Sequence, residues 1–360
     1  MSGTSSAETI DSIQVLRALA ALGVAATHYG LFYSYAAGDP RAFTMLAAGE
    51  AGVDLFFVIS GFIMVYASQP LYGAPHASGT FFARRLIRIV PIYWLFTTLY
   101  LLAAFAAPQF GKDISPDFVL ASYLFIPYPR EDGGMQPLVG QGWSLNYEML
   151  FYVIFALALF APRRIAIILA CLVVTAIGMV GFYIDIANPL LRFWASEIVI
   201  EFAFGMLIGF AYLEGLRLPR WLGWTLMLTG VGLLLAGAPL HAAIGGRILP
   251  WGIPATIAVA GAALGNPSAS GALWRWLIVI GEASYALYLC HAIAIRGVLT
   301  VLRKTGLELS FWAGLPLALA ICIVMAIAIY YGVERPVTRS LRNRFHVARG
   351  KPRKVEALPI

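Results

Sequence analysis

The sequence predicts an all-α, polytopic membrane protein with about ten transmembrane helices. Apolar residues make up 60% of its 360 positions and charged residues only 12%, and the mean hydropathy is +0.80. Soluble globular domains are much less apolar. Long apolar runs alternate with short breaks of Gly, Pro and charged residues, which is the pattern of helices that cross a bilayer several times.

Ten apolar runs are long enough to be membrane-spanning helices. They are Ile13–Tyr33, Gly52–Ser68, Leu86–Ala107, Trp143–Ala161, Ile165–Tyr183, Ala195–Tyr212, Leu222–Ala238, Ile248–Leu264, Leu277–Leu299 and Phe311–Val333. No basic cluster precedes the first run, so we expect it to remain as a helix rather than to be removed as a signal peptide. The chain then divides into an N-terminal segment (1–12), one transmembrane domain (13–333) and a basic tail (334–360).

The basic residues predict the orientation. With the N-terminus in the cytoplasm, most Lys and Arg residues fall on the cytoplasmic side, as the positive-inside rule requires. Both termini are therefore predicted to be cytoplasmic, and the longest outer connection is residues 108–142. The net charge of +7 indicates contact with membrane lipids rather than nucleic acid. The three cysteines all lie in apolar runs without metal-ligand spacing, which predicts neither a disulfide framework nor a metal site.

Ionisable residues inside the spans are the first candidates for function. His28 lies in the outer half of the first span, and Asp54, Glu148 and His291 are placed at a similar depth on three others. We expect these four side chains to converge. His28 is the predicted general base, Glu148 the carboxylate that orients it, and Asp54 a supporting or acceptor-positioning group. Separate hydrogen bonds between helices are the alternative, for Asp54 above all.

Two further sets of residues are weaker candidates. His291 has Ser284 and Tyr288 behind it on one helical stripe, and it either belongs to the site or packs between helices. Glu197 and Glu201 lie one turn apart on the sixth span. We favour a structural role for Glu201.

A pair of arginines marks the cytoplasmic entry of the third span. Arg85 and Arg88 are three residues apart, so their guanidinium groups share a helix face and suit bidentate binding of phosphate oxygens. Anchoring at the membrane edge is the alternative. A buried base across the membrane makes the phosphate interpretation the better one.

The order and spacing of these residues resemble acyltransferase family 3, the integral-membrane sugar O-acyltransferases that modify bacterial exopolysaccharides, O-antigens and nodulation factors. The resemblance covers nearly the whole chain. It rests on Ile13-Gln14-Val15-Leu16-Arg17-Ala18 with His28, Gly52-Val53-Asp54-Leu55-Phe56-Phe57-Val58-Ile59-Ser60-Gly61-Phe62, Arg85-Leu86-Ile87-Arg88, Trp143-Ser144-Leu145-Asn146-Tyr147-Glu148-Met149-Leu150-Phe151-Tyr152, Tyr288-Leu289-Cys290-His291 and Glu334-Arg335-Pro336.

The resemblance implies that the domain takes an acyl group, commonly acetyl, from cytoplasmic acyl-CoA and passes it to a saccharide hydroxyl. Arg85 and Arg88 would then hold the nucleotide phosphates. Arg17 shares a face with His28 about 16 Å away, which would mark a tunnel for the pantetheine arm. His28 would either deprotonate the acceptor hydroxyl or be acylated first, and the sequence leaves both routes open.

The resemblance also places the acceptor. Trp143, Asn146, Tyr147 and His291 are assigned to substrate binding, and Asn146-Tyr147 stands where many members carry Ser and Val, so the choice of acceptor is expected to differ. The tail resembles that of members without an appended hydrolase-like domain, so transfer is expected to finish within the membrane domain or with a separate partner.

Two rival functions use the same general features. A transporter or flippase of a glycan or lipid-linked sugar would also carry charges inside its spans, but it predicts inverted repeats and matching broken helices, which the sequence does not show clearly. A polysaccharide polymerase or ligase predicts a large basic outer loop. The connection 108–142 has more acidic than basic residues, which disfavours that function.

Overall fold

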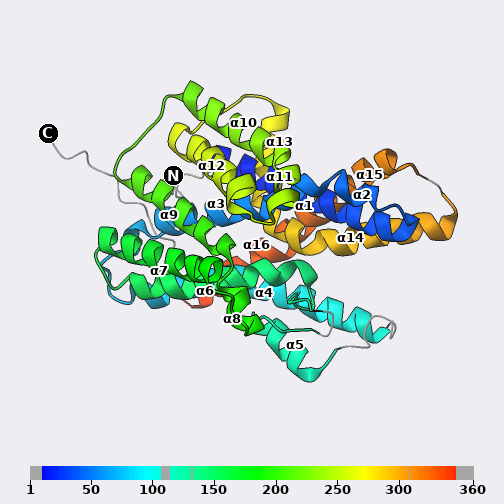
Figure 1. Cartoon of the computed structure of the whole chain (residues 1–360), viewed down its shortest axis with the longest axis horizontal. Helices are drawn as coiled ribbons and strands as arrows, with labels where there is room; N and C mark the ends of the chain where they lie inside the picture. The colour runs from blue at the N-terminus through cyan, green and yellow to red at the C-terminus, as the bar shows by residue number, and fades with distance from the viewer. Residues whose placement is uncertain (1–9, 107–113, 131–132, 308, 346–360) are drawn as a thin grey trace.

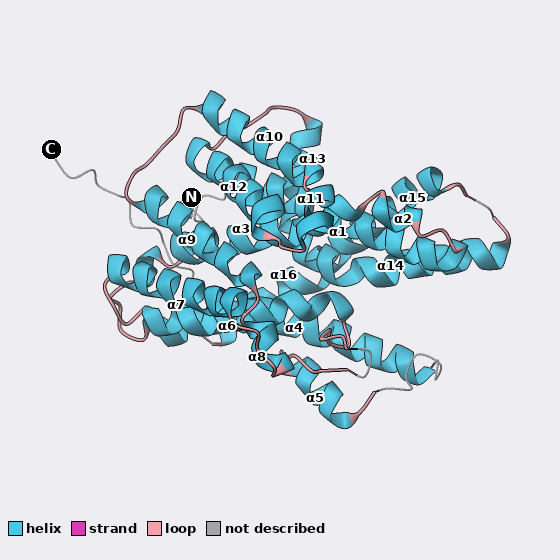
Figure 2. Cartoon of the chain, in the orientation of Figure 1, coloured by secondary structure: helices cyan, strands magenta, loops and turns pink. Residues whose placement is uncertain are grey.

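The structure is a computed structural model, and it describes residues 10–106, 114–130, 133–307 and 309–345. These residues form helices and loops without a strand (Figure 2), which confirms the all-α prediction. The α-helices are α1 (Asp11–Ala37), α2 (Arg41–Thr44), α3 (Gly52–Ala67), α4 (Ala77–Ala106), α5 (Pro116–Tyr123), α6 (Trp143–Ala158), α7 (Arg163–Tyr183), α8 (Pro189–Trp194), α9 (Ile200–Leu213), α10 (Arg220–Ala236), α11 (Ala238–Ile244), α12 (Ile253–Gly265), α13 (Ala272–Glu282), α14 (Ser284–Thr305), α15 (Phe311–Ile329) and α16 (Arg335–Arg344).

Short 3-10 and π-helical turns join several of these elements. Those that matter below are η1 (Ala47–Ala51), η4 (Gly140–Gly142), η6 (Ile248–Gly252) and η7 (Tyr330–Glu334). The predicted N-terminal segment, outer connection and tail include residues 1–9, 107–113, 131–132 and 346–360, which lie outside the described residues.

Eight helical segments in the described part of the chain are long and apolar enough to cross a membrane, and α10 with α11 would make a ninth. Ten spans were expected. The remaining one corresponds to α6, whose 16 residues are fewer than the roughly 20 of a typical span. The predicted span Leu222–Ala238 ends in a bend of 52° between α10 and α11, and the predicted span Leu277–Leu299 is broken at Ala283, between α13 and α14.

The predicted outer connection 108–142 contains α5 and η4 in its described part. Ser115 begins α5 by accepting a hydrogen bond from the Phe118 amide with its hydroxyl, and Pro116 occupies the first helical position. Both are standard features of a helix start. Local capping therefore starts a short helix within the predicted outer connection.

Helix α1 lies in the middle of the fold, in contact with α3, α12, α13, α14 and α15 (Figure 1). Two glycines allow this close packing. A Cβ atom on Gly52 would lie 2.4 Å from the Ala20 carbonyl oxygen, and one on Gly281 would lie 2.0 Å from that of Gln14. Because any larger residue would push these helices apart, α1 is held between α3 and α13.

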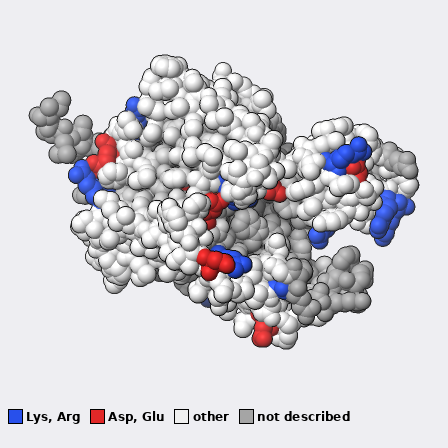
Figure 3. Space-filling model, in the orientation of Figure 1, with Lys and Arg blue, Asp and Glu red and all other residues white. Residues whose placement is uncertain are grey.

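The outer helices carry the exposed apolar surface. Leu172 on α7 and Val324 on α15 are 61% and 69% exposed, as lipid-facing side chains would be. The face drawn in Figure 3 is mostly uncharged, and acidic and basic atoms gather around a hollow near its middle. The exposed apolar helices and the uncharged face are those of a multi-pass membrane protein.

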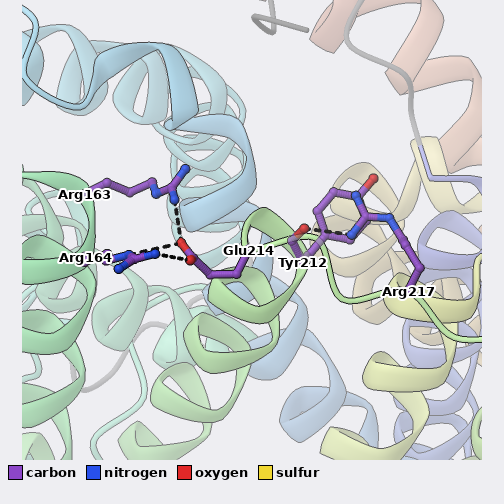
Figure 4. A network of polar contacts seen from close by, with 5 residues as sticks. All are labelled: Arg163, Arg164, Tyr212, Glu214 and Arg217. Carbon is purple, nitrogen blue, oxygen red and sulfur yellow. Dashed lines mark hydrogen bonds and ion pairs between the residues drawn. The ribbon is translucent and has the colours of Figure 1, made fainter. Parts of the chain in front are cut away.

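A charged network ties the start of α7 to the end of α9 (Figure 4). Arg163 and Arg164 each donate a hydrogen bond to Glu214, with the closest nitrogen–oxygen distances at 2.5 Å. The hydrogen bond from Arg164, with that from Arg163, holds the pKa of Glu214 below its usual value. Beside it, the Arg217 guanidinium lies 3.7 Å from the centre of the Tyr212 ring. This network fixes one end of the bundle.

Candidate functional site

Two histidines from different helices meet inside the bundle. The rings of His28 on α1 and His291 on α14 have their centres 4.8 Å apart in an edge-on arrangement. His28 is half-buried, and His291 is fully buried. The two residues are far apart in sequence, so α1 and α14 bring them together. The structure therefore places His28 beside His291, which the sequence analysis ranked as a weaker candidate than Glu148.

Backbone carbonyls define which ring nitrogen of each histidine is free. The Nδ1 atom of His28 lies 2.9 Å from the Val24 carbonyl oxygen, and that of His291 lies 3.1 Å from the Leu287 carbonyl oxygen. Because a carbonyl only accepts hydrogen bonds, Nδ1 is the donor in both rings. In each neutral ring Nε2 then carries the lone pair, and Nε2 of His291 is buried without a hydrogen-bond partner among the described residues.

A polar stripe on α14 runs from the histidines towards the start of α1. Tyr288 shares a hydrogen bond of 2.7 Å with Ser144 on α6. Ser284, one turn earlier, accepts a hydrogen bond of 2.8 Å from the Arg17 guanidinium. Helices α1 and α14 therefore run in the same direction, with Arg17 beside Ser284 at one level and His28 beside His291 at the other.

Glu148 does not orient His28, although the sequence predicted this role. Its carboxylate accepts hydrogen bonds from Ser60 at 3.1 Å and from Tyr152 at 3.0 Å, while the Val24 carbonyl orients the histidine ring. The reason lies in the direction of α6. Ser144 is level with Tyr288, and Glu148 lies one turn further on, towards the arginines. Tyr152, which the sequence analysis missed, follows Glu148 at the i+4 spacing of a helix face.

Arginines from two helices form a cationic cluster at the other end of the stripe. We define the arginine cluster as Arg17, Arg85 and Arg88. Arg88 and Glu148 lie close enough to both Arg17 and Arg85 for their charges to act on these two residues. The Arg85 guanidinium lies 5.4 Å from the centre of the Phe81 ring, and its buried Nε has no hydrogen-bond partner among the described residues. Three guanidinium groups gathered in one place can bind phosphate oxygens.

Asp54 is not beside His28 either. It is fully buried and forms a two-point ion pair with Arg247, with nitrogen–oxygen distances of 2.6 and 3.1 Å. Gly52, at the start of α3, packs against Ala20, which is eight residues, or about 12 Å of helix, before His28. The expected convergence of four ionisable residues at one depth is therefore wrong. Helix α3 begins beside Ala20, nearer the N-terminus of α1 than His28 is.

The sequence analysis missed Arg247. This residue lies between α11 and the π-helical turn η6, and its backbone amide donates to the Glu197 carboxylate. Its guanidinium lies 4.6 Å from the centre of the Trp251 ring. The fully buried carboxyl of Glu201 lies close enough for its charge to act on Arg247. The one sequence feature that could have identified Arg247 is its position as a single arginine between Gly246 and an apolar run.

The predicted acceptor-binding residues Trp143, Asn146 and Tyr147 lie at the start of α6, and their surroundings differ from one another. The Tyr147 hydroxyl donates to the Phe193 carbonyl oxygen at 2.6 Å, and the two rings are stacked with centres 4.3 Å apart. Trp143 lies edge-on to Tyr147. Asn146 is fully buried, and neither amide atom of its side chain makes a hydrogen bond within the described part of the chain. Such an amide is costly to bury unless something else binds it.

Metal ligands do not gather here. Across the described residues, no three His, Cys, Asp or Glu side chains are arranged to hold a metal ion. The chemistry that the site can perform with its own side chains is proton transfer or nucleophilic attack at Nε2 of a histidine, and the arginine cluster lies about 16 Å away along α1.

Comparison with known proteins gives one family. A family model described as an acyltransferase domain matches residues 10–331. The exopolysaccharide production protein ExoZ of Rhizobium meliloti is 33% identical over 306 residues, covering 82% of this chain and 92% of ExoZ. The putative peptidoglycan O-acetyltransferase YrhL of Bacillus subtilis is 28% identical, covering 95% of this chain and 57% of YrhL.

A third relative is the acyltransferase MdmB of Streptomyces mycarofaciens, which is 26% identical with 94% of each chain covered. No solved structure matches this chain significantly.

Proposed function

Because this chain belongs to the acyltransferase family whose domain model it matches, we propose that it transfers an acyl group, most simply acetyl, from acyl-CoA to a hydroxyl group of an extracytoplasmic saccharide. An exopolysaccharide or O-antigen is the proposed acceptor, and the cell membrane is the proposed location. Relatives whose names specify exopolysaccharide production and peptidoglycan O-acetylation support a polysaccharide acceptor. One structural observation supports the proposal: the arginine cluster and the histidine pair lie at the two ends of one polar stripe.

The arginine cluster is the proposed site for the donor phosphates. Arg17, Arg85 and Arg88 supply several N–H groups in planar forks, which match phosphate oxygens. Glu148 lies beside them, and its hydrogen bonds to Ser60 and Tyr152 hold it in place. We therefore assign Glu148 to positioning these arginines. The acyl arm of the donor would follow α1 and α14 past Ser284 and Tyr288 to the histidines.

The histidine pair is the proposed site of transfer. Nε2 of His28 takes the proton from the acceptor hydroxyl, whose oxygen attacks the thioester carbonyl carbon. The carbon–oxygen bond forms, the carbon–sulfur bond breaks, and the leaving thiolate takes the proton. If His28 is acylated first, its Nε2 lone pair attacks the thioester carbonyl carbon and the carbon–sulfur bond breaks to release the thiolate. The acceptor oxygen then attacks the acyl carbon, the carbon–nitrogen bond breaks to restore His28, and the hydroxyl proton passes to the thiolate. Nε2 of His291 accepts a hydrogen bond from the acceptor, and Trp143, Asn146 and Tyr147 complete the proposed acceptor-binding side.

The experiment that tests this function is mass spectrometry of the surface glycan from cells with and without the intact gene. We expect acyl esters on the glycan in the presence of the gene, their loss on deletion, and their return with the wild-type gene but not with a His28→Ala gene. The mass of the lost group and its position identify the acyl group and the acceptor sugar. An unchanged ester content after deletion would exclude the proposed function.

A further inference from the structure

Helix α16 carries a basic groove that none of the roles above uses. The groove has a volume of about 520 Å³ and is lined by Tyr331, Arg335, Pro336, Arg339, Ser340 and Asn343. Arg335 and Arg339 are exposed, and Tyr331 on η7 is 44% exposed. The sequence predicts that this end of the chain is cytoplasmic, which is the side on which acyl-CoA is made available.

The groove has the side chains that a phosphate and an aromatic base require. Arg335 and Arg339 lie one helical turn apart, so their guanidinium groups share a face. The Arg335 guanidinium is 5.7 Å from the centre of the Tyr331 ring. The hydroxyl of Ser340 and the amide of Asn343 line the same groove and can donate hydrogen bonds. Guanidinium forks suit phosphate oxygens, and an exposed tyrosine ring suits stacking with a base.

The groove lies near the arginine cluster. Helix α16 packs against α4, and Figure 1 draws the two side by side. At 100° per residue, Arg342 lies within about 60° of Arg335 and Arg339 on α16, and its charge acts on Arg85 of α4. Glu334, directly before α16, lies close enough for the charges of Arg88 and Arg17 to act on it. The groove and the cluster therefore lie near one another at the junction of α16 and α4.

We propose that this groove binds a terminal phosphate ester, and that its source is the 3′-phosphate of the CoA donor, with the adenine ring on Tyr331. The inference rests on the proposed function, since it takes acyl-CoA as the donor. It extends the donor site beyond the arginine cluster, which then holds the pyrophosphate. An anionic lipid headgroup offers similar phosphate chemistry, but the position of Arg342, close enough for its charge to act on Arg85, favours the donor.

The test compares acetyl-CoA with acetyl-dephospho-CoA, which lacks only the 3′-phosphate, on the full chain in phosphatidylcholine nanodiscs. We expect the wild type to bind acetyl-CoA more tightly, by roughly tenfold or more, as for a charge-assisted contact. The double variant Arg335→Gln/Arg339→Gln should lose this preference, by weakening binding of acetyl-CoA and leaving that of the dephospho donor unchanged. Arg344→Gln is the matched control, because Arg344 lies on the opposite face of α16 and outside the groove.

Each other outcome overturns the inference in a recognisable way. A wild type that binds both donors equally, or a double variant that keeps the preference, excludes a 3′-phosphate site. If the double variant keeps the preference but retains less phosphatidylglycerol in native mass spectrometry, the groove is a lipid site. If the wild type binds neither donor, the proposed function itself fails. An Arg85→Ala variant separates the two sites, since it should weaken both donors equally.

Discussion

His28→Ala is expected to lower the kcat of acyl transfer by about 10²- to 10⁴-fold, the usual contribution of a general base, and to leave the affinity for the donor unchanged. The physical reason is the distance between the two functions. The arginine cluster lies at the other end of α1, about 16 Å away, so loss of the imidazole removes the proton acceptor without touching the proposed phosphate site. Steady-state kinetics and donor titration on the same purified sample measure both quantities.

The matched control for His28→Ala is His76→Asn, because His76 is an exposed histidine in the connection between α3 and α4. Asn tolerates its positive φ of 58°. The control should keep wild-type kcat. If His28→Ala retains more than about a tenth of the wild-type kcat, or weakens donor binding as much as it slows transfer, His28 is not the base. Incubation with labelled acetyl-CoA alone separates the two routes, since only acylation of His28 leaves label on the protein.

Asp54→Ala is expected to destabilise the protein by about 3–5 kcal/mol, the usual cost of leaving one partner of a buried ion pair alone. Asp54 is fully buried, and the Arg247 side chain is only 19% exposed, so water cannot replace the lost carboxylate well. Arg247→Ala should be similarly costly, because it leaves Asp54 beside the buried Glu201. The free energy of unfolding in a defined detergent is the quantity to measure.

The double variant Asp54→Ala/Arg247→Ala is the control for this ion pair. It removes both charges, so it should be more stable than the sum of the two single effects predicts. If the single variants are as stable as the wild type, the ion pair does not hold α3 to the segment before α12. If Asp54→Ala also loses acyl transfer in the fraction that remains folded, the acceptor-positioning role predicted from the sequence applies in addition to the structural one.

The helices were predictable because a helix that crosses the lipid bilayer needs a long run of apolar residues, which is visible in the sequence. Apolar runs located the long helices. The sequence also proposed Arg17, Arg85 and Arg88 for donor binding, and the structure places Arg88 close enough for its charge to act on the other two.

The break at Ala283 was missed, although Gly281, Glu282 and Ser284 interrupt the apolar run at this point. The bend between α10 and α11 lies at Gly237 and Pro239, two residue types that commonly interrupt a helix.

The histidine pair could be found from depth alone, but the partners of the carboxylates could not. Depth was judged from the side of the membrane on which each helix begins, which worked for His28 and His291 because α1 and α14 run in the same direction. It failed for Asp54, since Gly52 packs against Ala20 and lowers the start of α3. The partner of Asp54 is 193 residues away, in a segment where no regular periodicity restricts the position of a side chain.

The central claim is that the donor binds at one end of α1 and the acceptor reacts at the other, across the membrane. The most direct measurement uses proteoliposomes with the protein in one orientation, labelled acetyl-CoA outside and a saccharide acceptor sealed inside. With the arginine cluster facing outwards, we predict ester-linked label on the enclosed saccharide and none when the orientation is reversed. Label that appears only when donor and acceptor share a compartment would contradict the claim.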